Sequence, residues 1–207
     1  MIYLSGAVSE QLHRDLPPMA GWMLQPAKGN RPIGGRPWGA DNGCFGKGER
    51  FDADRWLRWL YDYRAYQETC LWAVVPDVVG DARATIERFE QYTPAVRSLG
   101  YRVAFVAQDG LERLAVPWES FDCLFIGGST AWKLSESAFD LIGQAAQRGK
   151  WTHVGRVNSE RRYRAFAAAG VGSVDGTYCA FGPDVNGPKV KRWSENAERQ
   201  PSLFVGA

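Results

Sequence analysis

Acidic and amide side chains follow several short apolar segments of this 207-residue chain. Asp41, Asp77 and Asp175 each stand at or near the end of such a segment, and Gln108 ends another. Two carboxylates on one face of a fold can divide the work of glycosyl transfer, one as nucleophile and one as general acid and base. A further carboxylate and an amide can pair with the donor and acceptor edge of a heterocycle. These residues predict a site that binds a guanine-like base and cleaves or forms its N-glycosidic bond.

Glycines and one aromatic residue accompany these polar groups. Gly127 and Gly128 can bring backbone N–H groups close to a carbonyl oxygen, and Phe45 can cover the face of a bound ring. Each signal also has a plain structural interpretation, because Asp-Gly and Gly-Gly pairs form turns and Gln108 can satisfy a neighbouring backbone group. We favour the chemical interpretation because six consecutive apolar segments end in this way.

Eight apolar segments must position these residues, and we expect each to contain a β-strand. They are Ile2–Val8, Gly21–Gln25, Trp38–Asn42, Leu71–Asp77, Arg102–Gln108, Cys123–Gly128, Thr152–Val157 and Val171–Thr177. Continuous apolar runs such as 71–75 are typical of strands buried on both faces, as in a parallel sheet covered by helices. The fold class predicted is α/β, a compact (β/α)8 barrel whose sites gather at the carboxyl ends of its strands. An open doubly wound sheet is the alternative.

Helical patterns separate most of these segments, and each starts at a residue type that caps helices. The caps are Asp52 or Asp54, then Asp81, then Ser135, then Asn158 or Ser159. Pro94 should kink or shorten the second of these helices. Residues 27–36 are typical of a loop, so the helix after the second strand is missing. We divide the chain into a catalytic barrel, 1–180, and a Gly/Pro/Asn-rich tail, 181–207, packed on the barrel or partly mobile.

Composition narrows the class of protein. No stretch approaches the ~20 apolar residues of a membrane span. The first residues resemble no secretory signal, so we expect a cytoplasmic protein, in the host cytoplasm if it is phage-encoded. The four cysteines form no CxxC pair and there are only two histidines, so we expect no metal, and we interpret His153 as a satisfied interior residue. Aromatic residues reach 13%, either as core or as a groove that stacks on flat ligands.

A formal net charge of +2 requires no polyanionic partner, so a nucleic-acid surface must come from local clusters of basic residues. Two clusters are candidates for holding phosphates, and either could instead be the solvated face of a helix. They are Arg156, Arg161, Arg162 and Arg164, and then Lys189, Lys191 and Arg192.

In their order and spacing, six segments resemble the tRNA-guanine transglycosylase superfamily, and more closely its phage and bacterial branch that inserts 7-deazaguanines into DNA. The segments are Ala-Asp-Asn-Gly-Cys-Phe at 40–45, Val-Pro-Asp at 75–77, Phe-Val-Ala-Gln at 105–108, Phe-Ile-Gly-Gly-Ser at 125–129, His-Val-Gly-Arg-Val-Asn-Ser at 153–159 and Gly-Ser-Val-Asp-Gly-Thr at 172–177. The resemblance implies the same barrel fold, no cofactor, and a base-exchange glycosyltransferase activity.

The resemblance also implies a role for each matching residue. Asp175 corresponds to the aspartate that attacks C1′ of the target nucleoside, and Asp41 to the aspartate associated with base binding and proton transfer. The substrate-binding set implied is Phe45 on the base face, Asp77 and Gln108 on its edge, Gly127 and Gly128 as backbone donors, and Val154 and Gly155 beside them.

Three departures from the family pattern bear on the substrate. Cys44 replaces the second glycine of the family's Asp-Ser-Gly-Gly-Phe/Tyr motif, and Gly46 stands where glutamine is usual. The zinc-binding Cys/His segment of the tRNA enzymes has no counterpart after Asp175. We therefore expect DNA as the partner in preference to tRNA.

The expected reaction exchanges a flipped-out guanine for a 7-deazaguanine base such as 7-cyano-7-deazaguanine. A helper protein that opens the DNA is a possible further partner. The alternatives are a tRNA-guanine transglycosylase, a non-catalytic nucleic-acid-binding partner on the same fold, and a hydrolase that cuts the N-glycosidic bond without reinsertion.

Overall fold

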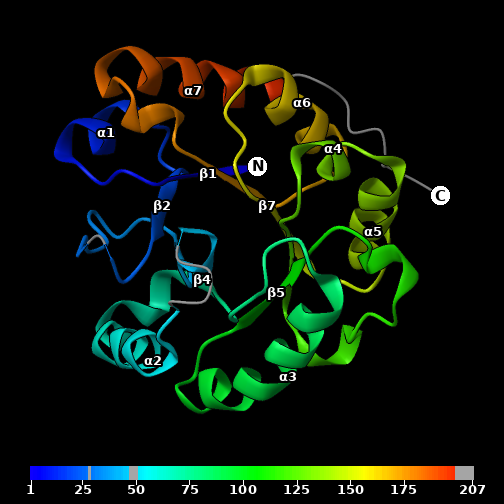
Figure 1. Ribbon diagram of the computed structural model, residues 1–207. Coiled ribbons are helices and arrows are strands. Elements are labelled where there is room, and N and C mark those ends of the chain that lie inside the picture. Colours follow the sequence, from blue (N-terminus) through cyan, green and yellow to red (C-terminus); the bar gives the residue numbers. More distant parts are fainter. Residues whose placement is uncertain (28, 47–50, 199–207) are drawn as a thin grey trace.

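The computed structural model of the protein describes residues 1–27, 29–46 and 51–198 (Figure 1). Eight parallel strands pair in sequence order, and the last pairs with the first, so the sheet closes into a barrel. The strands are β1 Ile2–Ser5, β2 Gly21–Leu24, β3 Trp38–Ala40, β4 Cys70–Val74, β5 Val103–Ala107, β6 Cys123–Ile126, β7 Trp151–Val154 and β8 Ser173–Gly176. The predicted (β/α)8 barrel is confirmed, and the open sheet is excluded because β1 and β8 are paired in parallel, with Leu4 opposite Asp175.

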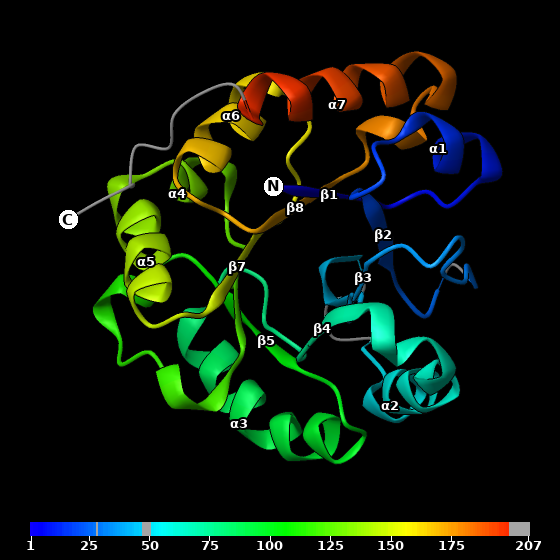
Figure 2. The ribbon, with the colours of Figure 1, turned by 180° about the vertical axis from the view of Figure 1, so that it is seen from behind.

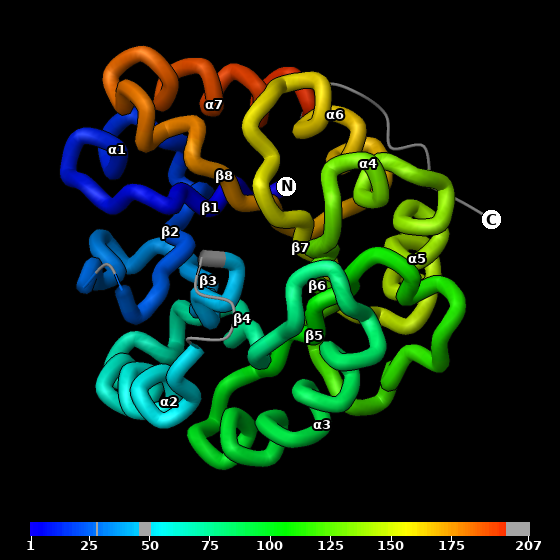
Figure 3. Tube along the Cα trace, viewed as in Figure 1, coloured from blue at the N-terminus to red at the C-terminus, as the bar shows by residue number. Residues whose placement is uncertain are grey.

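Helices surround the strands as an outer ring (Figure 3). They are α1 Glu10–Asp15, α2 Ala53–Asp62, α3 Ala82–Ser98, α4 Thr130–Lys133, α5 Glu136–Gln147, α6 Glu160–Ala168 and α7 Pro183–Glu198. The side chains of Asp52, Asp81, Ser135 and Ser159 each accept a backbone N–H in the first turn of α2, α3, α5 and α6. The four predicted caps are therefore confirmed. Helix α3 continues through Pro94 to Ser98, so the proline does not shorten it.

Helix α7 lies within residues 181–207, where the sequence composition predicted a tail rather than a helix. Composition missed it because Gly187 and Pro188 are poor helix formers, and burial of an apolar face stabilises the helix instead. Val190 and Trp193 are buried, and the Trp193 ring lies 4.8 Å from that of Tyr178. The helix lies beside α1 and α6 in both views (Figures 1 and 2), where it completes the outer ring.

The connection from β2 to β3 has no helix in its described residues, as predicted. A buried arginine, Arg36, holds this connection in place through hydrogen bonds to backbone carbonyls. The Arg36 guanidinium donates to backbone carbonyls at the end of α1 and in the turn after it, those of His13, Leu16, Pro17, Pro18 and Ala20. Burial lowers the pKa of Arg36. The side chain therefore joins the segment before β3 to the end of α1 and to the turn that leads into β2.

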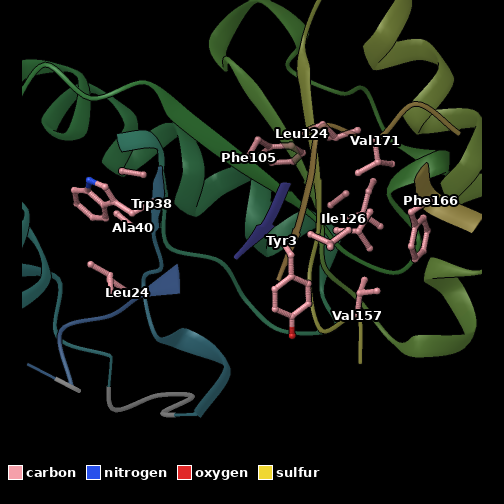
Figure 4. Close-up of a cluster of buried hydrophobic side chains, with 14 of the residues drawn as sticks. Tyr3, Leu24, Trp38, Ala40, Phe105, Leu124, Ile126, Val157, Phe166 and Val171 are labelled. Carbon is pink, nitrogen blue, oxygen red and sulfur yellow. The ribbon is translucent and has the colours of Figure 1, made fainter. Parts of the chain in front are cut away.

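The core has two layers, and most aromatic side chains belong to them. The larger layer lies between strands and helices and includes Trp38, Phe105 and Phe166 (Figure 4). The smaller fills the barrel interior with Trp72, Met23 and Val106 among others. A Cβ on Gly39 would lie 2.6 Å from the Trp72 ring, which explains a glycine in the middle of β3.

No described helix is both long and apolar enough to cross a bilayer.

Replacing Arg36 with methionine should lower the free energy of unfolding by about 3 kcal/mol, because several buried carbonyls lose their donor at once. Urea denaturation measures the difference. The control is Arg113→Met, whose side chain is 84% exposed in a surface pair, with an expected change below about 0.5 kcal/mol. A loss below about 1 kcal/mol for the Arg36 variant would contradict this role.

Candidate active site

A cavity of about 140 Å³ opens at the carboxyl ends of the strands. Apolar voids of about 150 Å³ hold one benzene ring, so this cavity has room for a flat heterocycle. Its apolar part is formed by Met23, Val74, Val106 and Phe125. The three predicted carboxylates line it together: Asp41 follows β3, Asp77 follows β4, and Asp175 lies in β8. Residues distant along the chain meet here because parallel strands all end on one rim.

Most of the other predicted binding residues also line this cavity. They are Phe45, Gln108, Gly127, Gly128, Gly155 and Arg156. Val154 does not: its side chain is fully buried in the layer between strands and helices. Successive strand residues face opposite sides, so the inward position in β7 belongs to His153 rather than Val154. The assignment of Val154 to substrate binding is therefore corrected.

Asp77 is held by two amides and keeps capacity for a ligand. Asn42 Nδ2 donates to Asp77 Oδ1 at 2.9 Å, and Gln108 Nε2 donates to Oδ2 at 2.6 Å. Burial raises the pKa of Asp77, and the two amide hydrogen bonds oppose that rise. A carboxylate has about four acceptor sites. Two therefore remain for a pair of N–H donors such as those on the edge of guanine.

Gln108 is largely committed within the protein. Its Oε1 accepts the backbone N–H of Gly80 at 3.0 Å and that of Gly128 at 3.1 Å. Gly127 N–H donates to the Ala107 carbonyl at 2.9 Å. Both glycine donors predicted for a ligand carbonyl are thus engaged, and the second hydrogen of Gln108 Nε2 is the remaining donor on this side. The structural interpretation of Gln108 is confirmed, because its side chain satisfies two backbone N–H groups. Its contact with a bound base stays a prediction, and the residue lines the cavity as that prediction requires.

The pKa of the Asp41 carboxyl is raised. Burial raises its pKa from 3.8 to about 7, helped by the charges of Asp175 and Asp77 and opposed by the N–H of Gly43. That N–H donates to Asp41 Oδ1 at 3.2 Å. Near neutral pH the side chain therefore exchanges a proton readily, which is the property of a general acid and base.

Asp175 receives a donor on each oxygen. The Arg156 backbone N–H donates to Oδ1 at 3.2 Å, and His153 Nε2 lies 3.1 Å from Oδ2. The Asp175 side chain is 16% exposed and His153 is fully buried. Arg156 adopts a left-handed backbone, with φ of 61°, at this point of contact. Such a conformation costs about 1 kcal/mol or more outside glycine and is typical of functional sites.

Two long basic side chains connect the loops after β6 and β7. Arg156 donates to the carbonyl of Gly128, and Lys133 Nζ donates to that of Gly155. Burial lowers the pKa of Lys133 to about 8, with the charge of Arg156 as a smaller cause. The Arg156 guanidinium also lies 4.4 Å from the centre of the Phe45 ring, which is 64% exposed at the cavity mouth. One face of Phe45 is therefore covered by a cation in this structure.

The predicted basic residues separate into two groups. Arg161 and Arg162 lie in the first turn of α6, at the end of the helix that is nearest the cavity. Lys189, Lys191 and Arg192 lie in α7. Lys189 Nζ is hydrogen-bonded to Asn186 at 3.3 Å. Of the predicted basic residues, all of which the structure describes, Arg156 lines the cavity and the others do not.

Three functional neighbours were not assigned from the sequence. Asn42 is adjacent to Asp41 and could have been found as a strand-end amide. The roles of His153 and Lys133 can be recognised only in the folded protein.

Among the described residues no group of three or more His, Cys, Asp or Glu side chains is placed to hold a metal ion. The four cysteines are unpaired.

No protein-family model matches this sequence, and no curated protein matches it either. The fold is similar to that of 3-hexulose-6-phosphate synthase from Salmonella typhimurium, with 13% identity, a TM-score of 0.56, and coverage of 95% of this chain and 97% of that one. It is similar also to the Amycolatopsis orientalis BexX/CysO complex, with 14% identity, a TM-score of 0.60, and coverage of 99% and 94%. At these identities the likeness establishes the barrel fold alone.

Tryptophan synthase from M. tuberculosis gives a weaker match, with 16% identity and a TM-score of 0.49. That match covers 79% of this chain and 60% of the tryptophan synthase chain.

Replacing Asp41 with asparagine should stabilise the protein at high pH. Because the folded-state pKa of about 7 lies above the ordinary 3.8, the native state binds the proton more tightly, and wild-type stability falls as pH rises between these values. At pH 8 the variant should be more stable by about 1–3 kcal/mol, and the difference should vanish near pH 4. Urea denaturation at several pH values measures it. The control is Asp140→Asn, at an exposed position on α5.

Proposed function

We propose that this protein is a base-exchange glycosyltransferase that replaces guanine in DNA with a 7-deazaguanine base such as 7-cyano-7-deazaguanine. The observation that carries the proposal is the pair Asp41 and Asp175, two carboxylates in one cavity whose surroundings hold them differently. Pairs of this kind divide acid–base and nucleophilic roles. The barrel neighbour 3-hexulose-6-phosphate synthase is an enzyme by its name, and the segments that resemble the transglycosylases supply the finer assignment.

Recognition of the base uses the edge groups that remain free. Asp77 accepts two N–H donors from the guanine edge, and the second Nε2 hydrogen of Gln108 donates to its carbonyl oxygen. The apolar side chains of Val106 and Phe125 lie along the same cavity and exclude water from the ring. Phe45, at the mouth, covers the ring or the nucleotide beside it after the Arg156 guanidinium moves to a phosphate.

The reaction proceeds in two displacements. An Asp175 oxygen attacks C1′, the C1′–N9 bond breaks, and the electron pair leaves with guanine while Asp41 gives N9 its proton. The incoming base then transfers its N9 proton to Asp41, N9 attacks C1′, and the bond to Asp175 breaks. Charge, protons and atoms balance, and Asp41 ends protonated as it began. Aspartate nucleophiles of this kind form covalent glycosyl intermediates.

DNA is favoured over tRNA because no cysteine cluster follows Asp175, which departs from the zinc-binding segment of the tRNA-acting relatives. The target base must leave the stack for C1′ to be reached. Arg156, Arg161 and Arg162 then lie where the flanking phosphates would pass. A helper protein that opens a duplex is compatible with this arrangement.

The test of the proposal is incorporation of labelled guanine into DNA and into tRNA, assayed in parallel. Wild-type protein should label DNA, and Asp175→Asn should lower the rate by at least about 10³-fold, because no covalent intermediate can form. Denaturing the enzyme during the reaction should trap the covalent intermediate as a protein–DNA adduct, whose mass is that of the protein plus the DNA strand without the released guanine. Asp140→Asn is the matched control and should act at the wild-type rate. Release of guanine without incorporation would identify a hydrolase, and binding without either would identify a non-catalytic partner.

The pH dependence tests the role of Asp41 separately. Because Asp41 must carry a proton to release guanine, the single-turnover release rate should fall about tenfold per pH unit above pH 7. Asp41→Asn should be slow and should lose this alkaline limb. A wild-type rate that stays constant from pH 6 to about 9 would exclude Asp41 as the acid.

A further inference from the structure

A chain of buried polar side chains lies behind Asp175. Trp151 Nε1 donates to Ser173 Oγ at 2.9 Å, Ser173 Oγ lies 2.8 Å from His153 Nδ1, and His153 Nε2 lies 3.1 Å from Asp175 Oδ2. His153 and Ser173 are fully buried. All four residues come from the adjacent strands β7 and β8, in which His153 pairs with Ser173. The barrel therefore fixes the spacing of the chain.

The donors and acceptors among these four side chains can be assigned in only one order when Asp175 is ionised and the imidazole of His153 is neutral. An indole N–H donates and never accepts, so Ser173 Oγ is the acceptor from Trp151. The single hydroxyl hydrogen of Ser173 then goes to His153 Nδ1, which must be unprotonated. The neutral imidazole carries its hydrogen on Nε2 and donates it to the carboxylate. A donor-only group begins the chain and an acceptor-only group ends it.

The surroundings keep the imidazole neutral and in one orientation. Burial lowers the pKa of His153, an effect that Asp175 opposes and the charge of Lys133 reinforces. The ring is packed between Trp72, with centroids 4.6 Å apart, and Phe125, with centroids 4.5 Å apart. The charged groups facing it are Asp175 and Lys133. His153 is therefore a poor proton carrier and a well-fixed hydrogen-bond donor.

The connectivity Ser–His–Asp also occurs in hydrolases with a serine nucleophile, but the accessible end is reversed here. Ser173 is fully buried and does not line the cavity, whereas Asp175 does. The group that can meet a substrate is the carboxylate.

We propose that His153 is a positioning residue that aims the Asp175 carboxylate at the substrate by donating from Nε2, and that Ser173 and Trp151 fix the tautomer this requires. With the Arg156 N–H on Oδ1 and His153 on Oδ2, each oxygen holds one donor and keeps a lone pair for the cavity. The inference rests on the proposed role of Asp175 as nucleophile. The protonation of the two His153 ring nitrogens can be measured without an activity assay.

The first experiment is ¹⁵N NMR of the histidine side chains over about pH 5–8. The chain has only two histidines, and the His153 signals are those that disappear in His153→Gln. We expect Nε2 protonated and Nδ1 unprotonated throughout. A ring protonated on Nδ1 alone, or one that takes up a second proton across this range, would overturn the proposal whether or not the protein exchanges bases.

The second experiment measures base exchange in variants of the chain. His153→Leu removes the donor and should lower kcat about 100-fold with KM for the base changed less than about threefold, because the carboxylate loses its alignment. His153→Gln places an amide N–H near the position of Nε2 and should recover to within about tenfold of wild type. Ser173→Ala and Trp151→Phe should fall between these limits.

Melting temperatures show whether a variant loses activity because it has lost stability or because Asp175 is misaligned. The control is Trp118→Phe, which is not one of the four hydrogen-bonded residues. A folded His153→Leu variant with kcat within about threefold of wild type would contradict the proposal, as would equal losses in the Leu and Gln variants. Failure of the wild-type protein to exchange bases would contradict the proposed function instead, and the NMR result would then stand alone.

Discussion

The rest of the site depends on one constraint, the electrostatic cost of placing three carboxylates in one small cavity. Asp41, Asp77 and Asp175 line a space of about 140 Å³, and burial together with the charges of Asp175 and Asp77 raises the cost of ionising Asp41. The protein meets this cost differently at each position. Two amides donate to Asp77, and an imidazole and a backbone N–H donate to Asp175. Asp41 receives backbone N–H groups, and burial raises its pKa to about 7.

These differences among the three carboxylates depend on the neighbouring side chains that hydrogen-bond to them or to the loops around them. Asn42 and Gln108 favour the ionised form of Asp77 against the effect of burial. Lys133 and Arg156 connect the loop after β6 to the loop after β7, whose Arg156 N–H donates to Asp175. Removing one such partner leaves a buried group without its hydrogen bond, which costs more than an average surface contact. The polar rim is therefore one network, although its members come from six strands.

Much of the fold followed from local patterns. Each apolar segment from residue 2 to 177 contains one strand, and each cap residue starts its helix, because both signals depend on near neighbours in the chain. The strands are shorter than the apolar segments, since residues such as Asp77 and Gln108 leave the sheet to face the cavity. Helix α7 was not predicted, because its stability comes from packing against α1 and α6 rather than from its own composition.

The sequence by itself determined which residue types stand at the strand ends, and hence that carboxylates, an amide and glycines would share one rim. Only the tertiary structure decided what each group is free to do. It committed the Gly127 and Gly128 donors to the protein, turned Val154 outward, and set His153 behind Asp175. These outcomes depend on burial and on the pairing of β7 with β8, which brings together residues about twenty positions apart. Neither effect can be recognised from a short stretch of sequence.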